Sequence, residues 1–303
     1  MTARRSARER ATIPDSVWGY LCAAPAVLLL AALALGPIIA AIGLSLQRRL
    51  PIFGLHEFVG FANYLRLIED DRFWSACRVT LYFTGVSVAA ELALGLAIAL
   101  LLDRIGTRHP WLQAIVLIPW AVPTVVSARM WDWLYQLDHG LINYLLTGAA
   151  LVRHPVNWVG DPGWAIHAAI AMDVWKATPF AALLLLAGLK AIPPDLYRAA
   201  RADGAGAWAI FRRITLPLLA PTILIVVVFR SLDAFRVFDA VYVLTGGGPG
   251  NSTETLSIYA YKTLFQTLQF GYGSALACAM FGLMLVMIGG YLFLLRRRLR
   301  EAG

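Results

Sequence analysis

Charged residues are scarce in this sequence. Asp, Glu, Lys and Arg make up 15% of its 303 residues, against roughly 25% in a typical soluble domain. Hydrophobic residues make up 59% and the mean hydropathy is +0.67, so too few polar side chains remain to cover a soluble surface. This composition excludes a disordered chain and a collagen-like fibre, and it predicts a polytopic membrane protein.

Cysteine is rare as well, with three widely spaced residues in the whole chain. That number and spacing exclude a disulfide scaffold and provide no metal-ligand cluster. The five histidines also lack the close spacing of metal ligands. No serine–histidine–carboxylate set can be assigned, so the residues by themselves indicate neither a metal site nor a catalytic centre.

Six stretches are apolar enough to cross a bilayer, which takes about 20 residues of helix. They lie at roughly 18–46, 79–102, 111–134, 164–189, 214–235 and 274–295. Prolines inside the first, third and fourth stretches predict kinks there. The sequence therefore predicts an all-α membrane domain over 18–295, with a cytoplasmic tail at 1–17 and a basic cytoplasmic tail at 296–303.

Basic residues alternate across these spans and set the orientation. More than half of the 26 Lys and Arg residues fall on one set of alternate segments, which includes both ends of the chain. The positive-inside rule places that set, and both termini, in the cytoplasm. The first apolar run far exceeds the core of a signal peptide, so we expect it to be a span. The net charge of +8 thus reflects topology and does not call for nucleic acid as a partner.

The most informative cytoplasmic segment runs from Ile192 to Pro217. It predicts a helical hairpin at 193–213, because two prolines begin it, one of them suited to a first helical turn. Gly204 is placed to end the first helix in a left-handed conformation. Small residues and flanking arginines suit the cleft of a partner protein. A basic loop lying on anionic membrane lipid is the alternative.

The order of residues in this hairpin resembles the coupling motif of permease subunits of binding-protein-dependent ABC importers. The family pattern is Glu-Ala-Ala, three residues, Gly, nine residues, Ile-x-Leu-Pro. The matching positions here are Ala199, Ala200, Gly204, Ile214, Leu216 and Pro217. Arg198 stands where the family usually has Glu, so the charge offered to an ATPase is reversed.

A second run resembles the sugar-importing branch of that family. It extends from Phe238 to Pro249 and is followed by Thr253, and it is similar to maltose-permease-like subunits and, more loosely, to trehalose-importing relatives. The resemblance implies a type I ABC importer permease of six spans in the bacterial plasma membrane. It implies import of a sugar, a disaccharide or an oligosaccharide, by alternating access.

The same resemblance implies a division of labour. The expected partners are a second homologous permease, two ATPase subunits and an extracytoplasmic substrate-binding protein. This chain would be a non-catalytic subunit that binds no cofactor itself, with ATP and Mg held by the ATPase subunits. The residues implied in ATPase coupling are Arg198, Ala199, Ala200, Asp203, Gly204, Phe211 and Arg212.

The positions implied in the substrate path lie on the fourth and fifth spans. They are Lys176, Ala177, Phe180, Arg230, Asp233, Ala234 and Val237. A sugar needs polar groups for its hydroxyls and an aromatic face for its C–H side, and Phe180 with the three charged residues supplies both. Charges within spans usually face a partner or a cavity.

Other polar positions in the spans leave alternatives open. Arg230, Asp233, Arg236 and Asp239 recur every third residue with alternating sign, which also suits a self-neutralising ladder near the outer interface. Glu91 is the interior charge of the second span, and the sequence does not identify its partner. Tryptophans near the span ends are typical of an interfacial aromatic belt.

Three loop segments also carry expectations. The stretch 64–68 predicts a short amphipathic helix at the outer surface, and 142–146 predicts an interfacial segment. The glycine-rich stretch 245–250 lacks the Gly-Lys-Ser/Thr ending of a phosphate-binding loop, so it is either a turn or a docking surface for the binding protein.

Two other functions also fit the sequence. An ABC permease for a phosphate-bearing solute, such as a glycerol phosphate derivative, fits the lysine and arginine of the expected path. An ion-coupled carrier or a membrane enzyme working alone is the alternative of a different class. The coupling hairpin disfavours the latter two, because neither has a use for an ATPase socket.

Overall fold

The protein is mostly helical in the computed structural model, which describes residues 15–105, 109 and 111–302. Within that part of the chain, five helical segments are long and apolar enough to cross a membrane: Val17–Ser45, Asp71–Ile105, Pro162–Lys190, Ala207–Phe235 and Phe270–Phe293. A further pair, Trp111–Ala121 and Thr124–Leu134, forms a sixth candidate if the two count as one bent span. The predicted all-helical, multi-pass architecture is confirmed.

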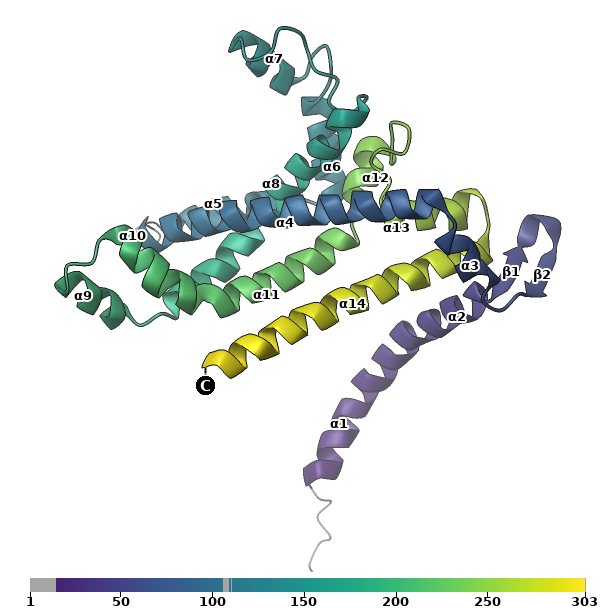
Figure 1. Ribbon diagram of the computed structural model, residues 1–303, viewed down its shortest axis with the longest axis horizontal. Coiled ribbons are helices and arrows are strands. Elements are labelled where there is room, and N and C mark those ends of the chain that lie inside the picture. The colour runs from purple at the N-terminus through teal and green to yellow at the C-terminus, as the bar shows by residue number, and fades with distance from the viewer. Residues whose placement is uncertain (1–14, 106–108, 110, 303) are drawn as a thin grey trace, which may run out of the picture.

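The first half of the first span projects away from the rest of the protein, whereas its second half lies beside α14 (Phe270–Ala302) (Figure 1). It consists of α1 (Asp15–Leu30) and α2 (Gly36–Ser45), joined through a π-helical turn at Ala31–Leu35. None of its most apolar window is buried, so its surface faces lipid or a partner. A hairpin of β1 (Gln47–Leu50) and β2 (Leu55–Phe58), paired antiparallel, follows it.

The predicted kink in the third span is an 86° bend between α5 (Trp111–Ala121) and α6 (Thr124–Leu134). Pro123 precedes α6 with ψ of 140°, and a residue before proline avoids the helical region, so helix α5 cannot continue through this point. The fourth span, α8 (Pro162–Lys190), continues as a helix through its own proline, Pro179.

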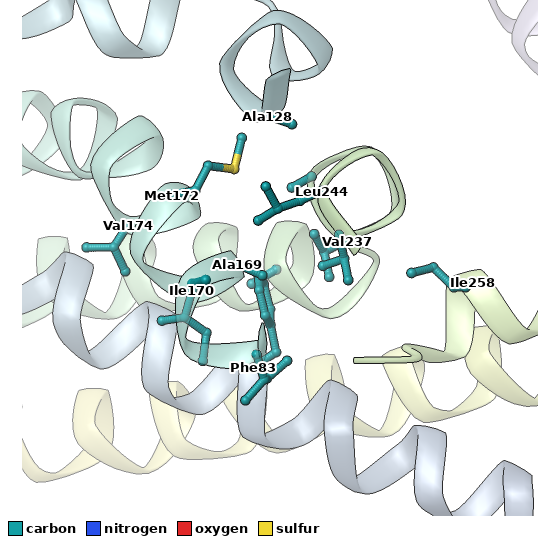
Figure 2. Packing of buried hydrophobic residues seen from close by; sticks show 14 of the residues in the cluster. Phe83, Ala128, Ala169, Ile170, Met172, Val174, Val237, Leu244 and Ile258 are labelled. Carbon is teal, nitrogen blue, oxygen red and sulfur yellow. The ribbon is translucent and has the colours of Figure 1, made fainter. Parts of the chain in front are cut away.

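The core lies where α8 packs against α4 (Asp71–Ile105). Figure 2 shows Met172, Ala169 and Ile170 of α8 with Phe83 of α4 and Ala128 of α6 gathered in one cluster. Further along α4, Gly95 allows a close approach of the two helices, because a Cβ there would lie 3.1 Å from the Cβ of Ala181. This packing holds the two long helices in one register.

The segments expected at the outer surface are helical. The stretch 64–68 falls in α3 (Ala62–Ile68), and 142–146 falls in α7 (Leu141–Gly148). Two further short helices are α12 (Asp239–Thr245) and α13 (Leu256–Tyr261), and a π-helical turn at Lys262–Gln266 follows α13.

The predicted helical hairpin at 193–213 is formed by α9 (Pro194–Ala202) and α10 (Ala207–Ile210). A π-helical turn at Phe211–Thr215 joins α10 to α11 (Leu216–Phe235). In Figure 1 the hairpin, the start of α1 and the end of α14 (Phe270–Ala302) lie toward the left and bottom, while α7, the β-hairpin and α3 lie toward the top and right. This arrangement agrees with an even number of crossings.

Candidate functional site

A cluster of charged side chains joins three spans at the centre of the protein. Arg230 of α11 directs its guanidinium at Glu91 of α4, with Nε 2.5 Å from Oε2 and Nη2 2.9 Å from Oε1. The exposed fractions of the two side chains are 6% and 1%. Glu91, whose partner the sequence did not identify, therefore belongs to a buried bidentate ion pair, which is the strongest geometry for such a pair.

Two further carboxylates contact the same arginine. Nη2 lies 3.4 Å from Oδ2 of Asp173 on α8, and Nη1 donates to Oδ2 of Asp233 one turn along α11. Asp233 is half-exposed, and its Oδ1 accepts a hydrogen bond of 3.2 Å from Arg236. Arg230 is thus surrounded by acids from three helices.

The alternating ladder suggested by the sequence is formed only in part. Arg230, Asp233 and Arg236 are paired along α11. Asp239 lies beyond the end of that helix, as the first residue of α12, so the three-residue spacing no longer places it on the same face.

Lys176 of α8 contacts the break in the third span. Its Nζ donates to the carbonyl oxygen of Val122 at 2.5 Å and to that of Trp120 at 3.3 Å. The bend removes the normal helical partners of these carbonyls. Although the sequence places Asp173 and Lys176 as neighbours on one face of α8, the lysine satisfies backbone groups of the bend.

Two adjoining cavities of about 470 and 560 Å³ lie beside this cluster. Both are lined by Trp120, Arg230, Asp233 and Arg236. The ring of Trp120 is stacked on that of Phe180, with centroids 5.9 Å apart and an angle of 18° between the planes. The cavities therefore offer an aromatic wall opposite ionised and hydrogen-bonding groups.

Six of the seven residues expected in the substrate path line these cavities. They are Lys176, Ala177, Phe180, Arg230, Asp233 and Val237. Ala234 differs, since it is 2% exposed and packs in the hydrophobic core. That the six contact a substrate stays a prediction.

Sequence reasoning missed several lining residues. The most important is Trp120, which the aromatic-belt interpretation did not single out. The sequence feature that could have identified Trp120 is its position between Pro119 and Pro123. Two prolines four residues apart predict a break in the helix, and a break exposes the side chains around it. Thr124 and Met284 also line the cavities, and nothing in their local sequence indicates it.

The residues expected to couple to an ATPase lie on an exposed surface of the helical hairpin. Arg198, Ala199, Asp203, Gly204 and Arg212 are exposed, and Ala200 and Phe211 are partly buried. Gly204 has φ of +77°, so it ends α9 in the left-handed conformation that the sequence predicted. The role of this set in coupling stays a prediction.

Arg198 is paired within its own helix. Its Nη2 donates to Oδ1 of Asp195, one turn earlier in α9. The neighbouring aromatic residues of the hairpin, Trp208 and Phe211, are stacked with centroids 5.6 Å apart. Trp208 remains 71% exposed.

The glycine-rich stretch 245–250 forms a tight turn. Gly246 ends α12 with φ of +63°, and Gly247 and Gly250 also have positive φ. The hydroxyl of Thr253 lies 2.7 Å from that of Thr245 and donates to the carbonyl of Gly248. The turn is therefore held by its own hydrogen bonds.

A second charged cluster ties the outer ends of the helices together. Glu254 accepts hydrogen bonds from Arg72 at 2.6 Å and from Lys262 at 2.9 Å. Burial raises the pKa of Glu254, but these two cations outweigh burial and hold its pKa below the ordinary value. Asp70 nearby accepts hydrogen bonds from the hydroxyls of Tyr259 and Tyr272.

Burial likewise raises the pKa of Asp70, while hydrogen bonds from the two tyrosines and from backbone N–H groups bring it below its ordinary value. Within the described residues, no group of three or more His, Cys, Asp or Glu side chains is arranged to hold a metal ion. The contacts of the outer cluster join the start of α4 to α13 and α14.

Comparisons with known proteins agree on a family of membrane transport proteins. Residues 91–300 match the family described as binding-protein-dependent transport system inner membrane component. The trehalose/maltose transport system permease protein MalF of Thermococcus litoralis is 45% identical over 88% of this chain and 90% of its own. The trehalose transport system permease protein SugA of Mycobacterium tuberculosis is 40% identical over 88% of this chain and 85% of its own.

The fold has a counterpart among solved structures. A chain of a bacterial alginate ABC transporter, in complex with an alginate pentasaccharide-bound periplasmic protein, superposes with a TM-score of 0.82. The match covers 96% of this chain and 98% of that one, at 23% identity.

Proposed function

Because the chain belongs to the family of binding-protein-dependent transport system inner membrane components, we propose that it is the permease subunit of an ATP-driven importer of an uncharged sugar, a disaccharide or an oligosaccharide. The observation that carries this proposal is the pair of cavities between α8 and α11, which combine stacked aromatic rings with ionised groups. The names of the relatives support the same substrate class.

The chemistry of the cavities suits a sugar. Asp233 is half-exposed and has lone pairs to accept hydroxyl hydrogens beyond those used by its two arginines. Lys176 donates to two carbonyls and has a third N–H available. The stacked Trp120 and Phe180 offer a flat apolar surface to the C–H side of a ring.

The charge of the site disfavours a phosphate-bearing solute. The cavities are lined by three basic side chains and three acidic ones, and Glu91 adds a fourth carboxylate behind Arg230. An anion site needs an excess of cationic or N–H groups directed at it. Here the most buried cation is already surrounded by acids.

The helices connect the cavities directly to the hairpin. Residues Ala207–Phe235 form one continuous helical segment that begins in the hairpin and carries Arg230 and Asp233 near its other end. Helix α8, which carries Lys176, ends at Lys190, shortly before α9. A displacement of the hairpin by an ATPase would therefore move both cavity-lining helices, as alternating access requires.

The proposal assigns partners to two surfaces. The exposed hairpin 193–213 would bind one of two ATPase subunits, which supply ATP and Mg. A second, similar permease would complete the path across the membrane, and the outer surface would receive sugar from a substrate-binding protein. A carrier or an enzyme working alone would leave the hairpin without a use.

Reconstitution tests this function. The chain is purified with its cognate permease and ATPase subunits, placed in proteoliposomes, and supplied with the cognate binding protein. Uptake of radiolabelled trehalose and maltose is expected to require ATP, the binding protein and this chain together. Transport by this chain alone, or uptake that continues without the ATPase subunits, would contradict the proposal.

A further inference from the structure

The ion pair between Glu91 and Arg230 lies at the edge of the cavities, and only Arg230 lines them. Arg230 lines both cavities. Glu91, at 1% exposure, is not among the described residues that line either one. Its carboxylate lies behind the guanidinium and meets Nε and Nη2 with both oxygens. A change at Glu91 therefore alters the arginine without removing a group that a substrate could touch.

A count of hydrogen-bond donors shows what this contact does. A guanidinium has five N–H groups in a fixed plane. Four of them already donate to carboxylates: two to Glu91, one to Asp173 and one to Asp233. Only one N–H of Nη1 remains for a solute. Arginine binds phosphates and carboxylates through one of two paired edges, Nε–Nη2 or Nη1–Nη2. Glu91 occupies the first edge, and Asp173 takes the remaining N–H of Nη2, so neither edge is left with two free donors.

We propose that Glu91 is a positioning and selectivity residue: by occupying the fork of Arg230 it makes the cavities accept uncharged polyhydroxy solutes and reject anionic ones. This inference rests on the proposed sugar function and deepens it. Arg230 then presents a single N–H donor to a hydroxyl, in a surrounding where acids outnumber bases. An anionic sugar finds no free fork and meets the carboxylates of Asp173 and Asp233 instead.

The role of Glu91 differs from that of the other two acids. Asp173 and Asp233 both line a cavity, so a substitution there removes a surface that the solute meets. Asp233 is also 53% exposed, and its loss affects hydroxyl binding directly. Glu91 acts only through Arg230, so its removal should change the charge preference of the site more than its affinity for neutral sugars.

The test measures binding without the binding protein, whose own specificity would mask that of the membrane site. The complex of this chain with its partner subunits, in nanodiscs, is titrated with radiolabelled trehalose and trehalose 6-phosphate. The two probes share one carbon skeleton and differ by a phosphate. The variants are Glu91→Gln, Glu91→Asp and the double variant Glu91→Gln with Arg230→Gln. Glu69→Gln, an exposed acid at the end of α3, is the matched control.

The wild-type complex and the Glu69→Gln control are expected to bind the phosphorylated probe at least about tenfold more weakly than trehalose. Glu91→Gln should raise the affinity for the phosphorylated probe at least about tenfold, because it removes the negative charge that offsets Arg230 and leaves one acceptor in place of two. Glu91→Asp keeps the charge and should keep the rejection. The double variant should lose the gain, because the cation that attracts the phosphate is gone.

Two results would overturn the inference: no gain in anion binding by Glu91→Gln, or a gain that persists in the double variant. If Glu91→Gln fails to assemble, Asp173→Asn withdraws a different carboxylate from Arg230, and it should give a smaller gain of the same kind. These outcomes depend on binding of the phosphorylated probe, so they test the role of Glu91 even if the wild-type complex transports neither trehalose nor maltose. A failure to transport either sugar would contradict the proposed function and not the role of Glu91.

Discussion

Glu91 and Arg230 are 139 positions apart in the sequence, and both oxygens of the carboxylate accept hydrogen bonds from the guanidinium at 2.5 and 2.9 Å. The pair joins α4 to α11 at the level of the two cavities. Both side chains are buried, so each depends on the other to compensate the cost of removing a charge from water.

This pairing predicts a strong asymmetry between single and double substitutions. Arg230→Met leaves Glu91 and Asp173 without their cation, and it should lower the stability of the complex by about 3–5 kcal/mol. Adding Glu91→Met removes the stranded carboxylate and should recover most of the loss, since a well-packed apolar pair can replace a buried ion pair. Thermal unfolding of the complex in detergent measures both, and purely additive losses in the double variant would contradict the account.

Lys176 is expected to stabilise the bend in the third span. Lys176→Met removes the donor that satisfies the carbonyls of Trp120 and Val122, at a cost of about 1 kcal/mol because water from the cavity can take its place. Backbone amides on both sides of the bend should exchange with deuterium faster in the variant. Lys190→Met, at the end of the same helix, is the control, and equal exchange in the two variants would argue against the role.

The hairpin offers a matched pair of glycines. Gly204 has φ of +77°, whereas Gly206 has φ of −69°, and a Cβ would meet no neighbouring atom at either position. Alanine at 204 should therefore strain the turn by about 1–2 kcal/mol, while alanine at 206 should be tolerated. If the hairpin couples to an ATPase, Gly204→Ala should reduce ATP-dependent uptake without weakening sugar binding to the complex. Equal uptake by the two alanine variants would speak against that coupling geometry.

The outer cluster predicts a loss of stability in acid. The pKa of Glu254 lies below its ordinary value of 4.5 in the folded protein, so its carboxylate form is favoured by folding. Its contribution is fully present above pH 4.5 and is lost as the pH falls through the lower value of the folded state. Melting temperatures measured across this acid range should fall, and Glu254→Gln should flatten that fall because it has no carboxylate to protonate. Glu57→Gln, an exposed acid in β2, should retain the wild-type slope.

The sequence allowed much of the architecture to be predicted, because span length, charge placement and turn signals are local properties. The bend near Pro123, the left-handed Gly204 and the short outer helix at 64–68 all follow from nearby residues. The sequence does not predict which face of the first span contacts a partner, because none of the most apolar part of that span is buried against this chain.

Side-chain partnerships between helices could not be predicted in the same way. Spacing within α8 places Lys176 and Asp173 on one face, but it could not show that the lysine also contacts carbonyls that only the bend exposes. Spacing within α11 predicted the contact of Arg230 with Asp233, and said nothing of Glu91, because that contact depends on how α4 and α11 pack. Trp120 is a cavity residue for the same reason, through its stacking on Phe180.

The most direct test of the central claim, that the cavities between α8 and α11 form the sugar path, is the initial rate of ATP-dependent sugar uptake by the reconstituted complex carrying Asp233→Ala. Asp233 lines both cavities and is half-exposed, so its loss removes the main hydroxyl acceptor while leaving the buried Glu91–Arg230 pair in place. Uptake should be abolished, with normal assembly of the complex and with Glu57→Gln indistinguishable from the wild type. Uptake by the Asp233→Ala complex with unchanged kinetics would contradict the account.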